Sequence, residues 1–458
     1  MNIRFLTIFI FTLIFITIIG YGYKTFFYKK STGKENFLFY NKRTISEKHA
    51  YERYMNTSDI PKNYYRINDS LKTNQDSLPL IQTIHEVIKL FQGLFTKSTY
   101  ADATILFFQT LNRSDENLKH LHNKRKWPKN IHFINSIYGI DLIVSKSHFA
   151  YIMRDTICTS DSSQKNNKCI PDSYVVHSKN ELQKLIHNFD PNSLYILKKN
   201  IQRQQGFFIS SKLDEILKKI KQDKSYVICQ KFLNDPYKIN DHKINLRVYL
   251  LIVIDDLKSP NTHLPLIDIS RVLKKVESGT NVSHLFKKEC DSNVKFYMYT
   301  NGFIYYTPQK YIEKHDKLEN IITSGYIDRK IYDENPMTFD ELQLYMGSDK
   351  YTSLMKSIYN QLLQVYDKYA KVIGNLNKNI PGCKFSLFGC DIAPDKNLNV
   401  KILEINKGPD ISFKDERDKK VKFNLLKDIF TLVGLVPNTN KFDSSPNEFI
   451  EISRKKNV

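Results

Sequence analysis

The stretch Lys384–Asp410, which reads KFSLFGCDIAPDKNLNVKILEINKGPD, decides the fold of this chain. Two runs within it, Phe385–Ile392 and Val400–Asn406, are apolar and typical of β-strands. The residues between them begin at Pro394 and are rich in Asp and Asn, which favour turns. The stretch therefore predicts a β-hairpin with a short polar turn.

Two carboxylates and an amide come together in this hairpin. When the chain folds back about the midpoint of Asn397 and Leu398, Asp391 lies opposite Glu404. Asn406 shares a face with Glu404, because side chains two apart in a strand point the same way. Oxygen ligands of this kind suit a hard cation such as Mg2+ that also contacts phosphates. An ordinary hairpin whose polar residues face water fits the spacing equally well.

The order of residue types favours the metal site. The motifs F-x-L-F-G-x-D and L-E-I-N-x-x-P resemble the last nucleotide-and-metal motif of the tubulin tyrosine ligase-like family. The resemblance implies an α/β (α+β) chain with the ATP-grasp fold and a divergent N-terminal domain. It implies that ATP and Mg2+ are used to activate a carboxylate as an acyl phosphate, which an amine attacks to give an amide bond. The implied metal ligands are Asp391, Glu404 and Asn406.

Two lysines match phosphate-side motifs of the same family. Gly139–Lys146 resembles the segment that leads to the "T-R-K-D" turn, which makes Lys146 a candidate phosphate ligand, although a surface lysine is an equally good interpretation. Tyr195–Asn200 resembles the "W-I-x-K-P" strand and points Lys198 at the phosphates. The glycine-rich flap of the family corresponds to 202–206, which keeps one glycine.

Two further strands supply the remaining candidate residues. Tyr226–Phe232 resembles "V-V-Q-K-Y-I", whereas a plain core strand is the alternative; the resemblance implies a base lined by Gln230, Lys231 and Phe232. His242–Tyr249 resembles "K-F-D-L-R-x-Y". Lys243 and Arg247 lie on one face of that strand and are expected to meet phosphates together, in a catalytic role as well as in nucleotide binding.

Three positions depart from the family pattern on the reacting side of the expected site. Asn245 stands where the family has aspartate. Tyr305 stands where the "G-x-x-R" motif has arginine, and Ser324 stands where "L-T-N" has asparagine. These changes favour an altered acceptor or a lost transfer step.

Several elements are expected outside the motifs. Thr104–Phe108 is a candidate strand, Thr338 begins a capping box, and Lys420–Leu435 suggests a final helix. The helix after Thr338 is expected to break near Gly347. A helical apolar stripe follows it and is expected to pack on the sheet, formed by Leu354, Ile358, Leu362, Val365, Tyr369 and Val372.

Length and composition predict a globular chain of about three domains. With 458 residues, 41% hydrophobic and 26% charged, the chain is not of the disordered class. We expect a divergent N-terminal region at 31–125, a central domain at 126–232, a C-terminal domain with the metal site at 233–436 and a flexible tail at 437–458. The six cysteines form no C-x-x-C pair, which disfavours a zinc site. Cys158 and Cys169 flank a polar loop and could pair in an oxidising compartment, whereas free thiols are the expectation.

The first 30 residues predict a membrane anchor. Phe5–Tyr23 is an apolar run without a charge, close to the length that a spanning helix needs. Lysines follow the run more densely than basic residues precede it, which predicts a single-pass protein with its body facing the cytoplasm.

The net charge of +21 favours acidic partners, although a Lys-, Asn- and Ile-rich composition is an alternative origin of the charge. By resemblance, the expected substrates are an amino acid and an acidic protein acceptor such as the tubulin C-terminal tail. A nucleotide-binding pseudoenzyme is a second hypothesis, and a basic membrane-tethered binding protein is a third. The sequence carries no recognised nucleic-acid motif, which disfavours nucleic acid as the partner.

Overall fold

The structure is a computed structural model of the whole chain. It describes residues 63–68, 95–97, 105–108, 111, 114–128, 131–156, 168–200, 206–233, 235–255, 265–278, 280, 293–312, 318–325, 327–435 and 447–454. The predicted anchor at 1–30, most of the N-terminal region and most of the 202–206 flap lie outside these residues. Within the described part of the chain, no helix is both long enough and apolar enough to cross a membrane.

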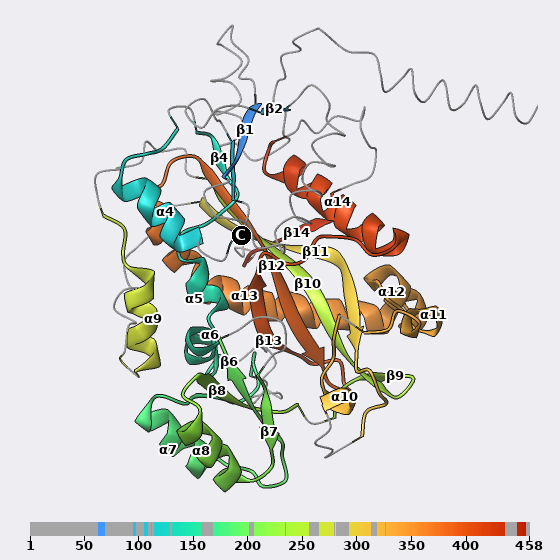
Figure 1. Cartoon of the computed structure of the whole chain (residues 1–458). Helices are drawn as coiled ribbons and strands as arrows, with labels where there is room; N and C mark the ends of the chain where they lie inside the picture. The colour runs from blue at the N-terminus through green and yellow to red at the C-terminus, as the bar shows by residue number, and fades with distance from the viewer. Residues whose placement is uncertain are drawn as a thin grey trace, which may run out of the picture.

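A large curled sheet forms the body of the molecule (Figure 1). Its order among the described strands is β14-β11-β10-β12-β4-β3-β1-β2, with β13 on β12 and β9 on β10. The bounds are β1 (Asn63–Asn68), β2 (Phe95–Lys97), β3 (Ile105–Phe108), β4 (Phe133–Ile134), β9 (Lys238–Ile239), β10 (His242–Asp255), β11 (Asn293–Tyr306), β12 (Cys383–Pro394), β13 (Val400–Lys407) and β14 (Phe449–Ile452). The strand expected at 104–108 is confirmed as β3.

β10 lies in the middle of the functional half of this sheet. It pairs with β11 on one side and with β12 on the other, both antiparallel. Almost every residue from Ile244 to Ile254 is buried, which explains why its sequence reads as one long apolar run. A polar residue inside such a strand needs a specific partner, so Asn245 and Arg247 mark a place where the strand does more than fill the core.

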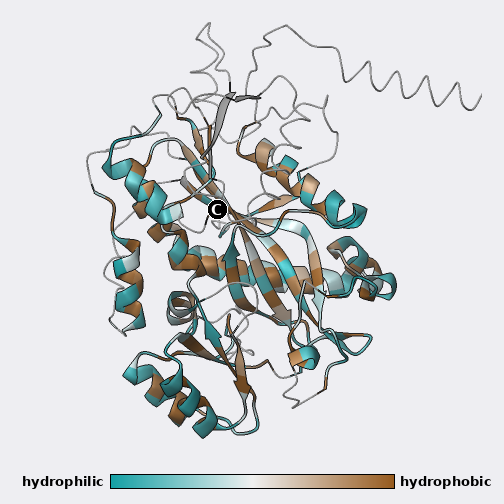
Figure 2. Ribbon diagram, in the orientation of Figure 1, coloured by the Kyte–Doolittle hydropathy of each residue, from teal (hydrophilic) through white to brown (hydrophobic). Residues whose placement is uncertain are grey.

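Helices surround the large sheet, and α13 crosses behind β10, β12 and β13 in Figure 1. The helices are α4 (Ser114–Asn123), α5 (Ile140–Val144), α6 (Lys146–Met153), α9 (Ile269–Glu277), α10 (Leu318–Ile321), α11 (Ile331–Glu334), α12 (Phe339–Met346), α13 (Ser348–Asn377) and α14 (Glu416–Leu432). The predicted stripe of α13 is confirmed, since all six residues are buried. Figure 2 shows the same division, with apolar residues along the inner faces of the helices.

Two helix boundaries follow from caps in the sequence. Thr338 and Glu341 form the expected capping box at the start of α12, and the helix ends at Gly347, whose φ is 84°. α14 begins at Glu416 rather than at Lys420, because the side chain of Asp415 accepts a hydrogen bond from the backbone N–H of Asp418.

A smaller sheet with its own core lies below the large one in Figure 1. Its order is β5-β8-β6-β7, made by β5 (Ser173–Val175), β6 (Tyr195–Lys199), β7 (Phe208–Ser210) and β8 (Tyr226–Lys231). Helices α7 (Lys179–His187) and α8 (Leu213–Gln222) cover it and help to enclose a separate hydrophobic cluster. The chain therefore has a mixed α/β fold with two cores, whereas the domain boundaries stay a prediction.

The hairpin β12–β13 has the predicted register at the carboxylates. Asp391 pairs with Glu404, and Gly389 pairs with Asn406. Nearer the turn the register differs by one residue, because Ile392 pairs with Ile402. Leu403 is therefore left without a partner and forms a β-bulge. The midpoint predicted for the turn was off by half a residue, and the bulge compensates for that error at the metal patch.

The bulge also decides which side chains enter the core. A regular strand would put Val400, Ile402 and Glu404 on one face. The structure instead buries Val400, Ile402 and Ile405, which frees Glu404 for the opposite side. The extra residue, Leu403, thus lets β13 bury Ile402 and Ile405 on one face while Glu404 points to the other.

Two expectations about the chain need correction. Residues 437–458 were expected to be a flexible tail, but Phe449–Ile452 forms β14 and pairs with β11. The ring of Phe449 packs on Tyr299, with centroids 4.9 Å apart, which gives this strand an apolar anchor. Cys169 is disulfide-bonded, so the expectation of free thiols is wrong for this residue.

α12 offers a matched test of the large core. Leu342 is fully buried, whereas Leu344, on the same helix, is 86% exposed. We expect Leu342→Ala to lower the free energy of unfolding by about 2–5 kcal/mol, because it leaves a cavity. Leu344→Ala should change it by no more than about 0.5 kcal/mol. Urea unfolding of both variants measures this difference, and equal losses would contradict the position assigned to α12.

Candidate functional site

A row of polar side chains crosses four neighbouring strands of the large sheet. Tyr305 on β11 lies in register with Asn245 on β10. Two residues along β10, Arg247 lies in register with Asp391 on β12, which in turn lies opposite Glu404 on β13. With about 4.8 Å between strands, the row from β11 to β13 spans about 14 Å, which is long enough to accommodate an extended polyphosphate.

The predicted metal patch is assembled as expected. The Asn406 side-chain N–H donates to Asp391 Oδ2 at 3.2 Å and to Glu404 Oε1 at 3.1 Å. All three side chains therefore meet on one face of the hairpin. Rotating the Asn406 side-chain amide by 180° would direct its oxygen, in place of its N–H group, toward the space between the two carboxylates, where it could bind a cation.

Arg247 binds one end of this patch. Its Nε donates to Asp391 Oδ1 at 2.8 Å and its Nη2 to Asp391 Oδ2 at 3.3 Å, a two-pronged contact. Gly389 makes this arrangement possible, because a Cβ at that position would lie 2.9 Å from Arg247 Nη1. The glycine of the F-G-x-D motif thus provides space for the guanidinium. The other side of Arg247 faces Tyr305, whose ring centroid lies 5.2 Å from Arg247 Cζ.

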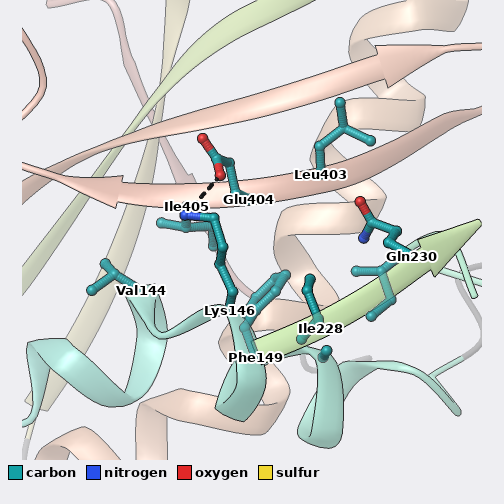
Figure 3. A pocket seen from close by; sticks show the side chains of 10 residues that line it. Val144, Lys146, Phe149, Ile228, Gln230, Leu403, Glu404 and Ile405 are labelled. Carbon is teal, nitrogen blue, oxygen red and sulfur yellow. Dashed lines mark ion pairs between the residues drawn. The ribbon is translucent and has the colours of Figure 1, made fainter. Parts of the chain in front are cut away.

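Three nearly buried lysines surround the other end. Lys146 Nζ lies 3.2 Å from Glu404 Oε2, and this ion pair is drawn in Figure 3. Lys198 Nζ donates to Gln230 Oε1 at 2.7 Å, and Gln230 in turn donates to Ser173 Oγ at 2.9 Å. Lys243 Nζ donates to a backbone carbonyl, that of Ile321, at 3.0 Å.

The pKa values of the two carboxyl groups are shifted in opposite directions. Burial raises the pKa of Asp391, an effect that outweighs Arg247 and that the nearby Glu404 reinforces. Burial would also raise the pKa of Glu404, but Lys146 and Lys198 together lower it to about 2. Glu404 is therefore ionised at neutral pH, and a further cation beside the pair would lower the raised pKa of Asp391.

Burial lowers the pKa values of two of these lysines, Lys198 and Lys243. Burial lowers the pKa of Lys198 to about 8, despite the attraction of Glu404. Burial and the neighbouring Lys198 lower the pKa of Lys243 to about 7. A bound polyphosphate would offset both effects, because it brings negative charge to these ammonium groups.

An apolar pocket lies between the two sheets beside this patch. Figure 3 shows Gln230 on β8 facing it from one side, and Glu404 and Leu403 on β13 from the other. Lys146 forms part of its rim, and Ile170 contributes an apolar wall. The cavity measures only about 10 Å³, which is room for about one water molecule, so a larger ligand would have to displace side chains that now fill the space between the sheets.

The structure places most, but not all, of the predicted residues around this space. Lys231 points away, since its Nζ bonds Asp190 Oδ2 at 2.9 Å on the far side of β8. The alternation of a strand explains this, because Gln230 and Lys231 must face opposite ways. Phe232 contacts the site indirectly, as its ring centroid lies 4.3 Å from Lys243 Nζ.

Three features were missed in the sequence. Leu403 and Ile170 line the pocket, and neither lies in a polar motif. The signal for the bulge was present, because Ile402 and Ile405 are apolar residues three apart, which no regular strand buries together. Nothing in the sequence marked Ile170. The side-chain Oδ1 of Asn245 is buried and has no hydrogen-bond partner among the described residues, which leaves an acceptor inside the site.

The donor set fits Mg2+ and phosphate. Two adjacent carboxylates with a raised pKa on one of them form a place where a divalent cation relieves like-charge repulsion. Four cationic side chains, Lys146, Lys198, Lys243 and Arg247, surround these two carboxylates, so the described site has an excess of positive charge. These side chains are of the types that bind a divalent cation and phosphate groups.

The chain belongs to the tubulin-tyrosine ligase family. The sequence profile of that family matches residues 121–258 and 290–442, which include every residue of the site described above. The resemblance suggested by the hairpin is thereby confirmed.

Over the aligned residues, the curated relatives named below are 22–26% identical to this chain. A probable alpha-tubulin polyglutamylase, Ttll1 of Tetrahymena thermophila, is 22% identical over 56% of this chain and 57% of its own length. The tubulin glycylase 3B of Drosophila melanogaster is 24% identical over 54% of this chain and 29% of its own. The mouse tubulin polyglutamylase TTLL6 is 26% identical over 53% and 27%, respectively. The matches thus cover from about a quarter to somewhat over half of the length of these relatives.

The lowered pKa of Lys243 predicts a pH dependence of stability. Its ordinary value of 10.5 applies to the unfolded chain, and its folded value is about 7. Between these values the unfolded chain binds more protons, so the contribution of Lys243 to the free energy of unfolding rises with pH. We expect wild type to gain stability relative to Lys243→Met as the pH rises from 7 to 10.

Urea unfolding at several pH values measures this gain. The matched control is Lys356→Met, which removes an exposed lysine of α13. Its difference from wild type should stay constant over the same pH range. A flat difference for Lys243→Met would show that this lysine is not held in its neutral form.

Proposed function

We propose that this chain is an ATP-dependent ligase with the ATP-grasp fold, which joins an amino acid to a carboxylate of an acidic protein. The observation that carries the proposal is the row Arg247–Asp391–Glu404–Lys146, in which cations flank both ends of a carboxylate pair. Family membership supports it, because the profile match includes this row.

In this proposal the base binds between the two sheets, where the small cavity beside Gln230 and Glu404 must widen to admit it. Gln230 contacts its polar edge, and Ile170 and Leu403 cover its faces. Lys146, Lys198 and Lys243 then hold the phosphates. Asp391, Glu404 and Asn406 are the residues that would hold Mg2+, which when bound neutralises phosphate charge and orients the transferred group.

The reaction is proposed to take place beside Arg247, on the side of Asp391 that faces away from Glu404. The acceptor carboxylate attacks the terminal phosphorus of ATP, the bond to ADP breaks, and an acyl phosphate forms. The amine of the co-substrate amino acid then attacks the acyl carbon and expels phosphate, which leaves an amide bond. Arg247 is placed to stabilise negative charge during both steps, since its guanidinium is fixed by Asp391.

The acceptor is proposed to be a glutamate-rich segment such as the tubulin C-terminal tail. The relatives named above carry tubulin modification in their names. The net charge of +21 supports an acidic partner, whose attraction should weaken as salt rises.

A nucleotide-binding pseudoenzyme is the second candidate. Its support comes from Asn245, which lacks the carboxylate that the family has at this position and has a buried acceptor without a partner. Such a chain would keep the metal patch and lose the transfer step. A basic membrane-tethered binding protein without nucleotide is the third, and the metal patch disfavours it, since a scaffold has no physical need for one.

One experiment with two readouts separates these candidates. Binding of MgATP is measured by calorimetry, and product is measured by mass spectrometry of purified tubulin incubated with MgATP and a mixture of labelled amino acids. We expect both binding and labelled tubulin. Glu404→Gln should weaken binding at least tenfold and abolish labelling, because it removes a metal oxygen and an ion-pair partner of Lys146.

The matched control is Glu416→Gln, which changes an exposed carboxylate at the start of α14 and should leave both readouts unchanged. Binding without labelling would favour the pseudoenzyme. Absence of binding by a folded wild-type protein would contradict both nucleotide-based candidates.

We propose that residues 1–30 tether the body to a membrane, with the body in the cytosol. The apolar run and the lysines after it support this. The disulfide at Cys169 weighs against the orientation, because cytosolic thiols are mostly reduced. Protease added to isolated membranes should digest the body. A body protected from protease, together with an oxidised Cys169, would place it in the lumen.

A further inference from the structure

A helix that the family profile does not include packs against the element that carries Lys146. The profile matches residues 121–258 and 290–442, so α9 lies between the two matched stretches. α9 contacts α5 and α6, and Figure 1 shows it beside them at the edge of the molecule. Because Lys146 is the first residue of α6, α9 is close to one of the proposed phosphate ligands.

α9 is fixed by apolar and polar contacts. Its inner face buries Ile269, Val272 and Val276 in the core of the large sheet. At its start, Asp268 Oδ2 lies 2.7 Å from Lys119 Nζ of α4. The helix therefore has a defined position against α4, α5 and α6, from which a side chain at its end can hold a neighbouring element.

The last residue of α9 begins a chain of hydrogen bonds to the start of α6. Glu277 Oε1 accepts a hydrogen bond from Ser147 Oγ at 3.2 Å. A carboxylate accepts but does not donate, so this bond uses the single hydroxyl proton of Ser147. Ser147 Oγ then accepts from Ser145 Oγ, which lies 3.1 Å away. Both serines are buried, so these bonds are shielded from water.

The direction of this chain decides how well α6 is capped. Ser145 is the N-cap of α6, and its Oγ accepts from the backbone N–H of His148 at 3.5 Å. A bond of this length is sensitive to the direction of the oxygen lone pairs. With its own proton directed at Ser147, Ser145 presents a lone pair to the helix. Without Glu277, Ser147 would donate to Ser145 and compete with the His148 N–H for the same oxygen.

Lys146 makes this cap more important than a neutral residue would. It is the first residue of α6, where the backbone of the first turn carries partial positive charge, so a cation is unfavourable there. Its side chain is 8% exposed, and its Nζ reaches Glu404 Oε2 of β13 at 3.2 Å (Figure 3). Fraying of the first turn would move the Lys146 backbone and lengthen that ion pair.

We propose that Glu277 is a positioning residue that holds Lys146 against Glu404. It acts through Ser147 and Ser145 on the start of α6. A consequence for MgATP affinity rests on the nucleotide-binding function proposed above, in which Lys146 contacts the phosphates. A helix outside the family match thus adjusts a site that lies inside it.

A double-mutant cycle on MgATP affinity tests this consequence. Calorimetry on the full chain in detergent compares wild type, Glu277→Ala, Lys146→Met and the double variant. We expect Glu277→Ala to raise the Kd for MgATP at least fivefold. In the Lys146→Met background the same change should raise the Kd less than twofold, because the residue through which Glu277 acts is absent. Equal effects in both backgrounds would overturn the proposal.

A conservative variant and a control on the same helix accompany the cycle. Glu277→Gln keeps an oxygen that accepts from Ser147, so it should restore the Kd to within twofold of wild type. Lys274 is exposed on the outward face of α9, and Lys274→Ala should leave the Kd unchanged. A loss in either variant as large as that in Glu277→Ala would count against the hydrogen-bond chain and overturn the proposal.

Chemical labelling tests the same position without nucleotide. Reductive methylation of the full chain, followed by mass spectrometry, gives the rate at which Lys146 reacts. Wild-type Lys146 should react slowly, because it is buried and ion-paired. Glu277→Ala should raise this rate at least fivefold and leave the rate at Lys356, an exposed lysine of α13, unchanged.

The labelling result separates this proposal from the proposed function. An unchanged rate at Lys146 in Glu277→Ala would overturn the positioning role even where MgATP binds. A raised rate in a protein whose wild type binds no MgATP would support the positioning role and contradict the nucleotide-binding function alone.

Discussion

Two carboxylates that lie side by side on adjacent strands are the constraint on which the rest of this site depends. Asp391 and Glu404 are paired across the hairpin, and both are half-buried. Like charges in such surroundings repel strongly, so each must have a cation. Arg247 supplies it from the neighbouring strand and Lys146 from a helix, which ties β10, the hairpin and α6 into one electrostatic unit.

The pocket joins two bodies with separate cores. Gln230 and Lys198 belong to the small sheet, whereas Glu404 and Leu403 belong to the large one. The two parts are already joined by apolar packing, because Val227 and Ile228 of β8 belong to the core of the large sheet. A ligand bound between Gln230 and Glu404 would add further contacts between the two sheets.

The sequence predicted the chemistry of the hairpin better than its geometry. Residue types and the period of two were enough to bring Asp391, Glu404 and Asn406 together. They did not reveal the bulge, because the period of two assumes a regular strand and so ignores the spacing of three between the apolar residues Ile402 and Ile405. Lys231 was assigned to the site from a motif in which the preceding residue, Gln230, faces the pocket. Strand alternation alone predicts that Lys231 points the other way. β14 was missed because a four-residue strand is recognised by the edge it pairs with, not by its own pattern.

The bulge at Leu403 gives this part of the chain an unusual sensitivity to length. In the turn at Asp395–Asn399, Lys396 and Asn397 are exposed, so an insertion beside Asn397 would disturb the core less than one inside the strand, although the turn also bonds Asp235 through the Lys396 N–H. An insertion or deletion between Ile402 and Ile405 would instead exchange the two faces of the strand beyond it. Glu404 would turn into the core and Ile405 toward the phosphates. Natural variation in this chain should therefore include changes of loop length at the tip of the hairpin and exclude them five residues further on, even where every residue type is conserved.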